Sequence, residues 1–147
     1  MNPVLEALTP LVGLWIAEIR WSEETHKLIG GPRSVRTPVS FNWIEDGSFL
    51  VHRIGTDTSP TARWIIGADE SSLDFAVLYS DDRQVSRLYN MSLREGVWKV
   101  YRKAPGFHQR FTGHFSADQK TIEARWEKSS DGTDWKLDFD ITYTKAA

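Results

Sequence analysis

The segment KLDFDITYT (residues 136–144) alternates apolar and polar side chains along its whole length. Leucine, phenylalanine, isoleucine and tyrosine occupy the odd-numbered positions from 137 to 143, and lysine, aspartate and threonine occupy the positions between them. A two-residue period places the apolar side chains on one face of an extended chain, whereas a helix would scatter them. The segment is therefore predicted to be a β-strand with one buried face.

The same period recurs through most of the chain, and about ten strands are expected. One clear run extends from Trp15 to Trp21, and another is centred on Phe41. Asn2-Pro3 before VLEAL instead predicts a short helix with Asn2 as its cap. The strands are separated by turn signals, which are Asp46-Gly47, Asp69-Glu70, Asp81-Asp82-Arg83, Glu95-Gly96, Asp118-Gln119 and Asp131-Gly132.

Turn length determines which residues face each other across a hairpin, because a slip of one residue turns a whole strand over. Two-residue turns are expected at most of the signals, and a three-residue loop is expected at 81–83. Apolar residues then meet apolar residues across successive hairpins. The expected pairs are Phe111 with Trp126, Phe115 with Ile122, Trp126 with Leu137, Ala124 with Phe139, Ile122 with Ile141, Trp64 with Phe75, Tyr79 with Val85 and Phe75 with Tyr89.

The hairpin around Asp46-Gly47 allows two registers. A two-residue turn sets Phe41 opposite His52, whereas a three-residue loop over 45–47 sets Phe41 opposite Val51. The second register is preferred on hydrophobic matching, because it sets Trp43 opposite Phe49 and pairs Phe41 with a valine instead of a histidine.

About ten strands with one apolar face must hide that face, and the sequence offers no long amphipathic helix to cover it. Closing the sheet on itself hides the face and removes the exposed edges, so an antiparallel up-and-down β-barrel is expected. A Bet v 1-like helix-grip fold needs a carboxy-terminal helix where this chain has a strand. A cystatin-like cone needs an amino-terminal helical block that is also missing. A two-sheet sandwich remains the alternative.

Composition narrows the class of protein. The 147 residues are enough for one domain, expected to span 1–147. The formal net charge is −2 with no basic stripe, which argues against nucleic acid as a partner. There are no cysteines, and no apolar run is long enough to span a membrane. The start MNPVLEALTPLVGLW lacks the features of a secretion signal, so a cytoplasmic location is expected.

The segment LVGLWIAEIRW (11–21) carries Gly13 and Trp15 as a Gly-x-Trp motif on the first expected strand. This start resembles the calycin superfamily of lipocalin-like and fatty-acid-binding barrels. The resemblance implies that Trp15 plugs the closed end of the barrel and that residues 22–37 form a lid over the open end. The chain is also similar to an uncharacterised bacterial lipocalin-like family through ARWIIG (62–67), RLYNMSL (87–93), RFTGHFS (110–116) and RWEKSSDGTDW (125–135).

Two better-known calycin groups differ from this chain at their ligand-binding residues. Fatty-acid-binding proteins hold a carboxylate with an Arg-x-Tyr pair on the last strand, whereas the last strand here has Tyr143-Thr144-Lys145. The Arg-x-Tyr of this chain, Arg87 and Tyr89, lies in mid-sequence. Nitrobindin-like barrels bind haem through a histidine on a late strand, and no histidine follows His114. No cofactor is therefore expected.

The inward face of the expected barrel carries an unusual set of polar residues. With a tip at Glu95-Gly96, Arg87 and Tyr89 share a face with Trp98 and Arg102, and Tyr89 lies opposite Arg102. An arginine enclosed in a dry interior is costly unless an acid, water or an anionic ligand compensates it. The polar residues expected to face inward are Arg53, Tyr79, Arg87, Tyr89, Arg102, Gln109 and Tyr143.

The functional interpretation of this face is an anion-binding pocket. Arg87 and Arg102 would hold a carboxylate or phosphate, with Arg53 nearby and Tyr89 orienting the ligand. The apolar walls would be Trp15, Trp43, Trp64, Trp98 and Trp126. The structural alternative is that the arginines reach solvent at the rim while their stems pack on aromatic rings.

The histidines give little support for a metal site. His108 and His114 alternate with phenylalanines and are expected to face outward, and no spacing supplies the three or four convergent ligands that a metal needs. His52 points inward only in the less favoured register, where it would be a candidate acid or base.

Three hypotheses of function follow. The first is a barrel that binds a small hydrophobic or amphipathic anion in its lumen. The second is an isomerase, cyclase or hydratase on the same scaffold, using Arg87, Tyr89 and His52. The third is a barrel filled by side chains that acts as an interaction protein, which a lumen without a pocket above roughly 300 Å³ would favour.

Overall fold

The computed structural model describes residues 1–56, 58–71 and 74–147. The strands over these residues are β1 (Gly13–Trp21), β2 (Ser34–Ile44), β3 (Phe49–Gly55), β4 (Pro60–Gly67), β5 (Phe75–Asp81), β6 (Ser86–Arg94), β7 (Val97–Arg102), β8 (His108–Phe115), β9 (Thr121–Ser129) and β10 (Lys136–Lys145). The helices are η1 (Pro3–Leu11), α1 (Glu23–Ile29) and η2 (Glu45–Gly47).

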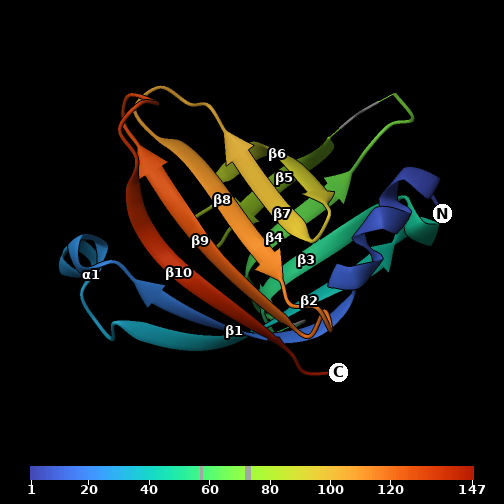
Figure 1. Cartoon of the computed structure of the whole chain (residues 1–147), viewed down its shortest axis with the longest axis horizontal. Coiled ribbons are helices and arrows are strands. Elements are labelled where there is room, and N and C mark those ends of the chain that lie inside the picture. Colours follow the sequence, from blue (N-terminus) through green and yellow to red (C-terminus); the bar gives the residue numbers. More distant parts are fainter. Residues whose placement is uncertain (57, 72–73) are drawn as a thin grey trace.

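The strands form one antiparallel sheet that closes into a barrel (Figure 1). Each strand pairs with its neighbours in sequence, and β1 pairs with β10 to complete the circle. Closure hides the apolar face and leaves no sheet edge exposed. The all-β up-and-down barrel with a short amino-terminal helix, expected from the sequence, is confirmed. No helix in the described ranges is long and apolar enough to cross a membrane.

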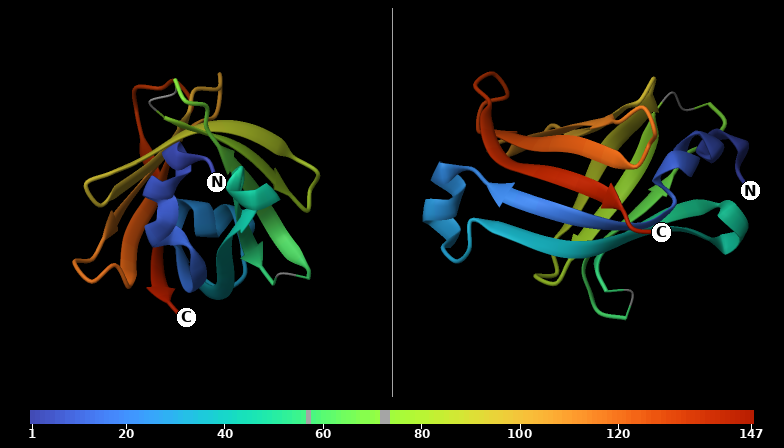
Figure 2. Two further views of the ribbon diagram at one scale, coloured as in Figure 1. Left: turned by 90° about the vertical axis from the view of Figure 1, so that its right-hand side faces the viewer. Right: turned by 60° about the horizontal axis from the view of Figure 1, so that its bottom comes forward.

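The helix η1 lies across one end of the barrel, which we call the closed end (Figure 2, left). Asn2 caps it as expected, because its side chain accepts a hydrogen bond from the Val4 backbone N–H at 3.0 Å. The Asn2 amide also donates to the Ala68 carbonyl at 2.8 Å, which ties the helix to the end of β4. Three leucines of η1 are completely buried and fill this end of the barrel: Leu5, Leu8 and Leu11.

The Gly-x-Trp motif sits directly beside this plug. Trp15 is 1% exposed, and its indole N–H donates to the Leu11 carbonyl at 2.8 Å. The Lys145 ammonium lies 4.6 Å from the centroid of the Trp15 ring. Trp15 therefore lies at the closed end, where the calycin resemblance places it.

The helix α1 lies at the other end, which we call the open end (Figure 2, right). Ser22 caps it by accepting from the Thr25 backbone N–H at 3.1 Å. The Thr25 hydroxyl donates to Asp138 on β10 at 2.8 Å, so the helix is fastened to the barrel rim. The connection is shorter than the expected lid of residues 22–37, because β2 already begins at Ser34.

Two expected hairpin registers are confirmed. In β8 and β9, Phe111 lies opposite Trp126 and Phe115 lies opposite Ile122. In β6 and β7, Met91 lies opposite Val100, the register that a tip at Glu95-Gly96 implies. Both tip residues have positive φ angles (53° and 76°), which a tight two-residue turn requires.

Three other hairpin registers were predicted wrongly, each by an even number of residues. Trp126 lies opposite Phe139 instead of Leu137, Trp64 opposite Tyr79 instead of Phe75, and Tyr79 opposite Arg87 instead of Val85. The remaining pairs of these hairpins shift with them, to Ala124 with Ile141, Ile122 with Tyr143 and Phe75 with Met91.

Carboxylates in the loops explain the longer connections. Asp131 accepts from the backbone N–H groups of Thr133 and Asp134, at 2.8 and 2.9 Å, and so stabilises a wide loop. Asp81 accepts from the backbone of Arg83 at 3.0 Å in the same way. Part of the loop after Asp69 lies outside the described residues. Because these shifts are even, the paired apolar residues named above stay on their predicted faces. The exception is Leu137, which lies opposite Glu127 because the β9–β10 register is irregular between Leu137 and Phe139.

The register of β2 and β3 is the one that was not preferred. Phe41 lies opposite His52, and the rings stack with centroids 3.9 Å apart and planes 2° from parallel. The preferred register was chosen by pairing apolar residues with apolar residues. That criterion does not count the stacking of an imidazole on a phenyl ring. The shift is odd, so it turns β3 over. His52 points into the barrel, and Arg53 lies on the outer face opposite Ser40 and Arg63.

Candidate functional site

The open half of the barrel encloses a cavity of about 400 Å³. This volume lies within the range of about 300–1,000 Å³ that is usual for small-molecule sites. We call the end beside α1 and the β5–β6 loop its mouth, and the end against the closed half its floor. The wall is rich in aromatic rings, which are those of Trp21, Trp64, Tyr79, Tyr89, Phe107, Trp126, Phe139 and Tyr143.

Arg87 is the second residue of β6 and lies at the mouth of the cavity. Its guanidinium carbon is 5.3 Å from the Phe107 ring centroid and 5.8 Å from that of Tyr79. Such cation–π contacts hold the side chain in place without neutralising its charge. Among the described residues, no carboxylate oxygen lies within 4.0 Å of the Arg87 guanidinium.

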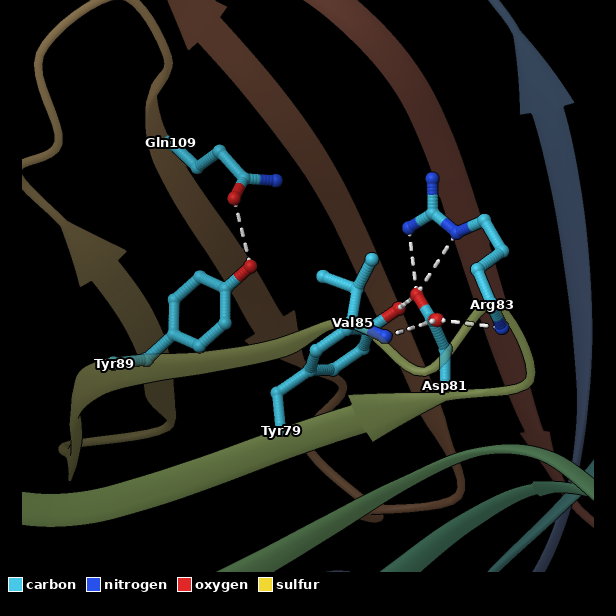
Figure 3. A network of polar contacts seen from close by, with 6 residues as sticks. All are labelled: Tyr79, Asp81, Arg83, Val85, Tyr89 and Gln109. Atoms are coloured by element: carbon cyan, nitrogen blue, oxygen red, sulfur yellow. Dashed lines mark hydrogen bonds and ion pairs between the residues drawn. The ribbon is translucent and has the colours of Figure 1, made fainter.

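A carboxylate at the end of β5, Asp81, is engaged by other groups (Figure 3). The Arg83 guanidinium donates to it at 2.6 Å, and the Tyr79 hydroxyl donates to it at 2.7 Å. These two donors hold the pKa of the Asp81 carboxyl well below its usual range. Burial and the bond to Asp81 together raise the pKa of Tyr79 to about 12. Arg83 therefore neutralises Asp81, and the charge of Arg87 is left uncompensated.

Asp138, the carboxylate on the other side of the mouth, is paired in the same manner. The Lys128 ammonium lies 3.6 Å from it, and the Thr25 hydroxyl donates to it at 2.8 Å. Lys128 also donates to the Thr25 hydroxyl at 3.1 Å. This triad anchors α1 and leaves the net positive charge of the mouth on Arg87.

A neutral donor lies on the wall near Arg87. The Tyr89 hydroxyl donates to the Gln109 side-chain oxygen at 2.7 Å, and both residues are buried (Figure 3). Burial raises the pKa of Tyr89, which keeps its hydroxyl protonated and donating. Gln109 lines the cavity, and because its oxygen is occupied, its amide N–H groups are the part that remains available for a further hydrogen bond.

The structure brings together part of the predicted site. Arg87, Tyr89, Trp64 and Trp126 all line the cavity. The inward polar residues Tyr79, Gln109 and Tyr143 also line it, as the strand period indicates.

The other predicted site residues lie elsewhere. Trp15, Trp43 and Trp98 pack in the closed half, where Trp98 is completely buried. Arg53 faces outward, as a consequence of the β3 register. Arg102 is the last residue of β7, and its guanidinium carbon lies 5.9 Å from the centroid of the Tyr89 ring. It lines a hollow on the outer surface instead of the cavity. The expectation that these residues surround one pocket is therefore wrong.

Several cavity residues were missed because they come from connections between strands. Arg83 belongs to the β5–β6 loop, Phe107 precedes β8, and Thr25 and Ile29 belong to α1. The alternating period carries no information about such residues. The cluster Asp81-Asp82-Arg83 appeared in the sequence only as a turn signal.

His52 is completely buried behind Trp64, whose ring centroid is 4.9 Å away. Its Nδ1–H donates to the Ser40 carbonyl at 3.1 Å, and burial lowers its pKa to about 4. His52 is therefore neutral near pH 7. His108 accepts from the Ala104 backbone N–H at 3.1 Å. In the described part of the chain, no group of three or more His, Cys, Asp or Glu residues could hold a metal ion.

Comparison with known proteins supports the fold. Neither a scan against protein-family models nor a search of curated proteins found a match. Among solved structures, the crystal structure of Rv2717c from M. tuberculosis is similar, with a TM-score of 0.63. The alignment covers 100% of this chain and 99% of that chain at 13% sequence identity. At this identity the likeness shows the closed barrel fold that the two chains share.

Proposed function

We propose that the protein binds a small amphipathic or aromatic anion in the open half of its barrel. The observation that carries this proposal is the uncompensated Arg87 guanidinium at the mouth of a cavity of about 400 Å³ with aromatic walls. An arginine in partial burial costs free energy that an anionic ligand would recover. A carboxylate or phosphate at the mouth would form charge-assisted hydrogen bonds with it.

The rest of the cavity suits the apolar part of such a ligand. Trp64 and Trp126 contribute aromatic surface to the wall, and Ile54 and Ile141 contribute aliphatic surface. The Gln109 amide supplies a second donor for an acceptor group near the acid. The lid helix α1 contributes Ile29 to the wall, which supports entry of the ligand beneath it, as in the calycin barrels that the sequence resembles.

Binding is favoured over catalysis by the state of the titratable groups. A general acid or base must reach the reactive atom of a bound molecule. Asp81 is held ionised by Arg83, Asp138 is paired with Lys128, and His52 is separated from the cavity by Trp64. A filled barrel is disfavoured by the cavity itself, which exceeds roughly 300 Å³.

The test is binding of the fluorescent anion 1-anilinonaphthalene-8-sulfonate to the wild-type protein and to Arg87→Met. Hydrogen bonds to a charged group contribute about 1.5–3 kcal/mol, so the variant should bind at least about tenfold more weakly. Arg63→Met is the matched control, because Arg63 is exposed on the outer face. Equal affinity in wild type and Arg87→Met, or equal losses in both variants, would contradict the proposal. So would a wild-type protein that does not bind this anion.

A further inference from the structure

The floor of the cavity includes Trp64 and Tyr143, and His52 and Trp98 pack directly behind these two rings. Several hydrogen-bonding atoms of these side chains lack partners. In the described ranges, the buried side-chain nitrogen and oxygen atoms without a hydrogen bond are His52 Nε2, Trp64 Nε1, Trp98 Nε1 and Arg102 Nε. Apart from the arginine, they all belong to one cluster of rings. The Trp64 centroid lies 4.9 Å from that of His52 and 6.2 Å from that of Trp98.

Tyr143 joins this cluster to the cavity. Its ring centroid lies 5.7 Å from that of Trp98, and the residue lines the cavity although it is only 3% exposed. Its hydroxyl makes no hydrogen bond with the other residues that the structure describes, and burial alone raises its pKa. The floor therefore contains a neutral hydroxyl that faces the lumen unsatisfied.

These atoms have complementary roles. The two indole N–H groups can only donate, and the Tyr143 hydroxyl can donate or accept. His52 donates to the Ser40 carbonyl through Nδ1, so its Nε2 can only accept while the ring is neutral. Buried polar groups without partners are rare, and a concentration of them calls for an explanation. A floor that only had to fit a hydrocarbon tail would need none of them.

The cavity is thus polar at two opposite ends. Arg87 lies at the mouth beside the β5–β6 loop. Tyr143 lies two residues before Lys145, whose ammonium donates to the Val12 carbonyl at the closed end. Between these ends the wall is apolar, with Trp126 and Ile141 among its members.

We propose that the floor is a second polar subsite, which binds a neutral group able to donate and accept, such as a hydroxyl, at the end of the ligand remote from its acid. This inference rests on the proposed function and narrows its ligand class. The ligand is a molecule with two polar ends and an apolar middle, and it is distinguished from a simple fatty acid by its far end.

The experiment compares decanoate with 10-hydroxydecanoate by isothermal titration calorimetry. The two acids differ only in the far end of the chain. An apolar floor would disfavour the hydroxy acid, because burial would strip water from its hydroxyl without replacing the lost hydrogen bonds. A polar floor reverses this order. We expect wild-type protein to bind 10-hydroxydecanoate at least threefold more tightly than decanoate.

Three variants locate the preference. Tyr143→Phe should abolish or reverse it, because only the floor hydroxyl is lost. Tyr79→Phe is the matched control, since it removes a hydroxyl at the mouth that Asp81 already engages, and it should keep the wild-type ratio. Arg87→Met should weaken both acids by a similar factor and leave their ratio unchanged.

The outcomes separate the two proposals. Equal or tighter binding of decanoate by the wild-type protein overturns the polar subsite and indicates that the floor holds water or nothing polar. A preference that survives in Tyr143→Phe overturns it as well. Unchanged affinity for both acids in Arg87→Met overturns the proposed function instead. Failure of both acids to bind at millimolar concentration overturns both.

Discussion

Acidification from about pH 6.5 to about pH 4 is expected to destabilise the protein through His52. The ring is completely buried between Phe41 and Trp64, and burial lowers its pKa from 6.5 to about 4. The unfolded chain therefore binds a proton between these two values that the folded chain does not bind. A group of this kind favours unfolding progressively as the pH falls from about 6.5 to about 4.

The magnitude follows from the size of the shift. Each pKa unit corresponds to 1.36 kcal/mol, so a shift from 6.5 to about 4 corresponds to a loss of about 3 kcal/mol, most of it complete by about pH 4.5. Loop carboxylates act at lower pH. Hydrogen bonds from Asp134 and Thr133 lower the pKa of Asp131 to about 2, so the stability it contributes is lost only as the pH falls below its unfolded value of 3.8.

The assay is urea unfolding of wild-type protein and His52→Phe at several pH values between about 7.5 and 4.5. Phenylalanine retains a flat ring against Phe41 but binds no proton. The difference in unfolding free energy between the two proteins should change by about 2.5 kcal/mol over this range, in the direction that favours the variant at low pH. The absolute stability of the variant does not matter, because only the pH dependence is used. Parallel pH profiles would refute the burial of a neutral His52 and, with it, the observed register of β3.

Two further predictions concern charge and packing. Asp81→Asn should break the ion pair with Arg83 and so add one positive charge to the mouth of the cavity. Binding of 1-anilinonaphthalene-8-sulfonate should then tighten severalfold at low salt and less at high salt. An unchanged affinity would mean that Arg83 turns to solvent. Trp98→Ala should lower the unfolding free energy by about 3–5 kcal/mol in urea titrations, because the ring is completely buried among Phe41 and Phe111. Trp135→Ala, which removes a ring stacked on Arg110 outside the barrel, should cost about 1 kcal/mol or less, and similar losses in both variants would contradict a solid closed half.

The sequence was sufficient to predict the faces of most strands, because alternation is a property of the extended chain itself. It was insufficient for the loops. The connection after Asp131 depends on which backbone N–H groups its carboxylate reaches, and the same holds for Asp81. These choices shift a register by an even number of residues, so they change neighbours without turning a strand over. The register of β2 and β3 differs by an odd number of residues and turns β3 over, so that His52 stacks on Phe41 where a valine was expected.

The sequence also could not predict where along the barrel axis an inward-pointing residue lies. Trp15, Trp98 and Trp126 all point inward, and nothing in their local sequence separates the first two, in the packed half, from the third, on the cavity wall. The division depends on η1, which fills one end with leucines, and on α1, which rims the other. The helices at the two ends therefore determine where along the barrel axis an inward side chain meets packed core or cavity. The alternating pattern determines only whether a side chain points into the barrel or out of it.

The two arginines on the apolar face of β6 and β7 therefore have different environments. Arg102 is the last residue of β7, and its guanidinium carbon lies 5.9 Å from the Tyr89 ring centroid where the chain leaves the barrel. Arg87 lies opposite Tyr79, whose hydroxyl is already bound to Asp81, and its guanidinium rests between two rings. Because those rings fix the side chain before any ligand arrives, little conformational entropy remains to be lost on binding. The acid that would neutralise Arg87 is instead paired with Arg83 within the same loop, so the attraction for an anion is a property of this one hairpin.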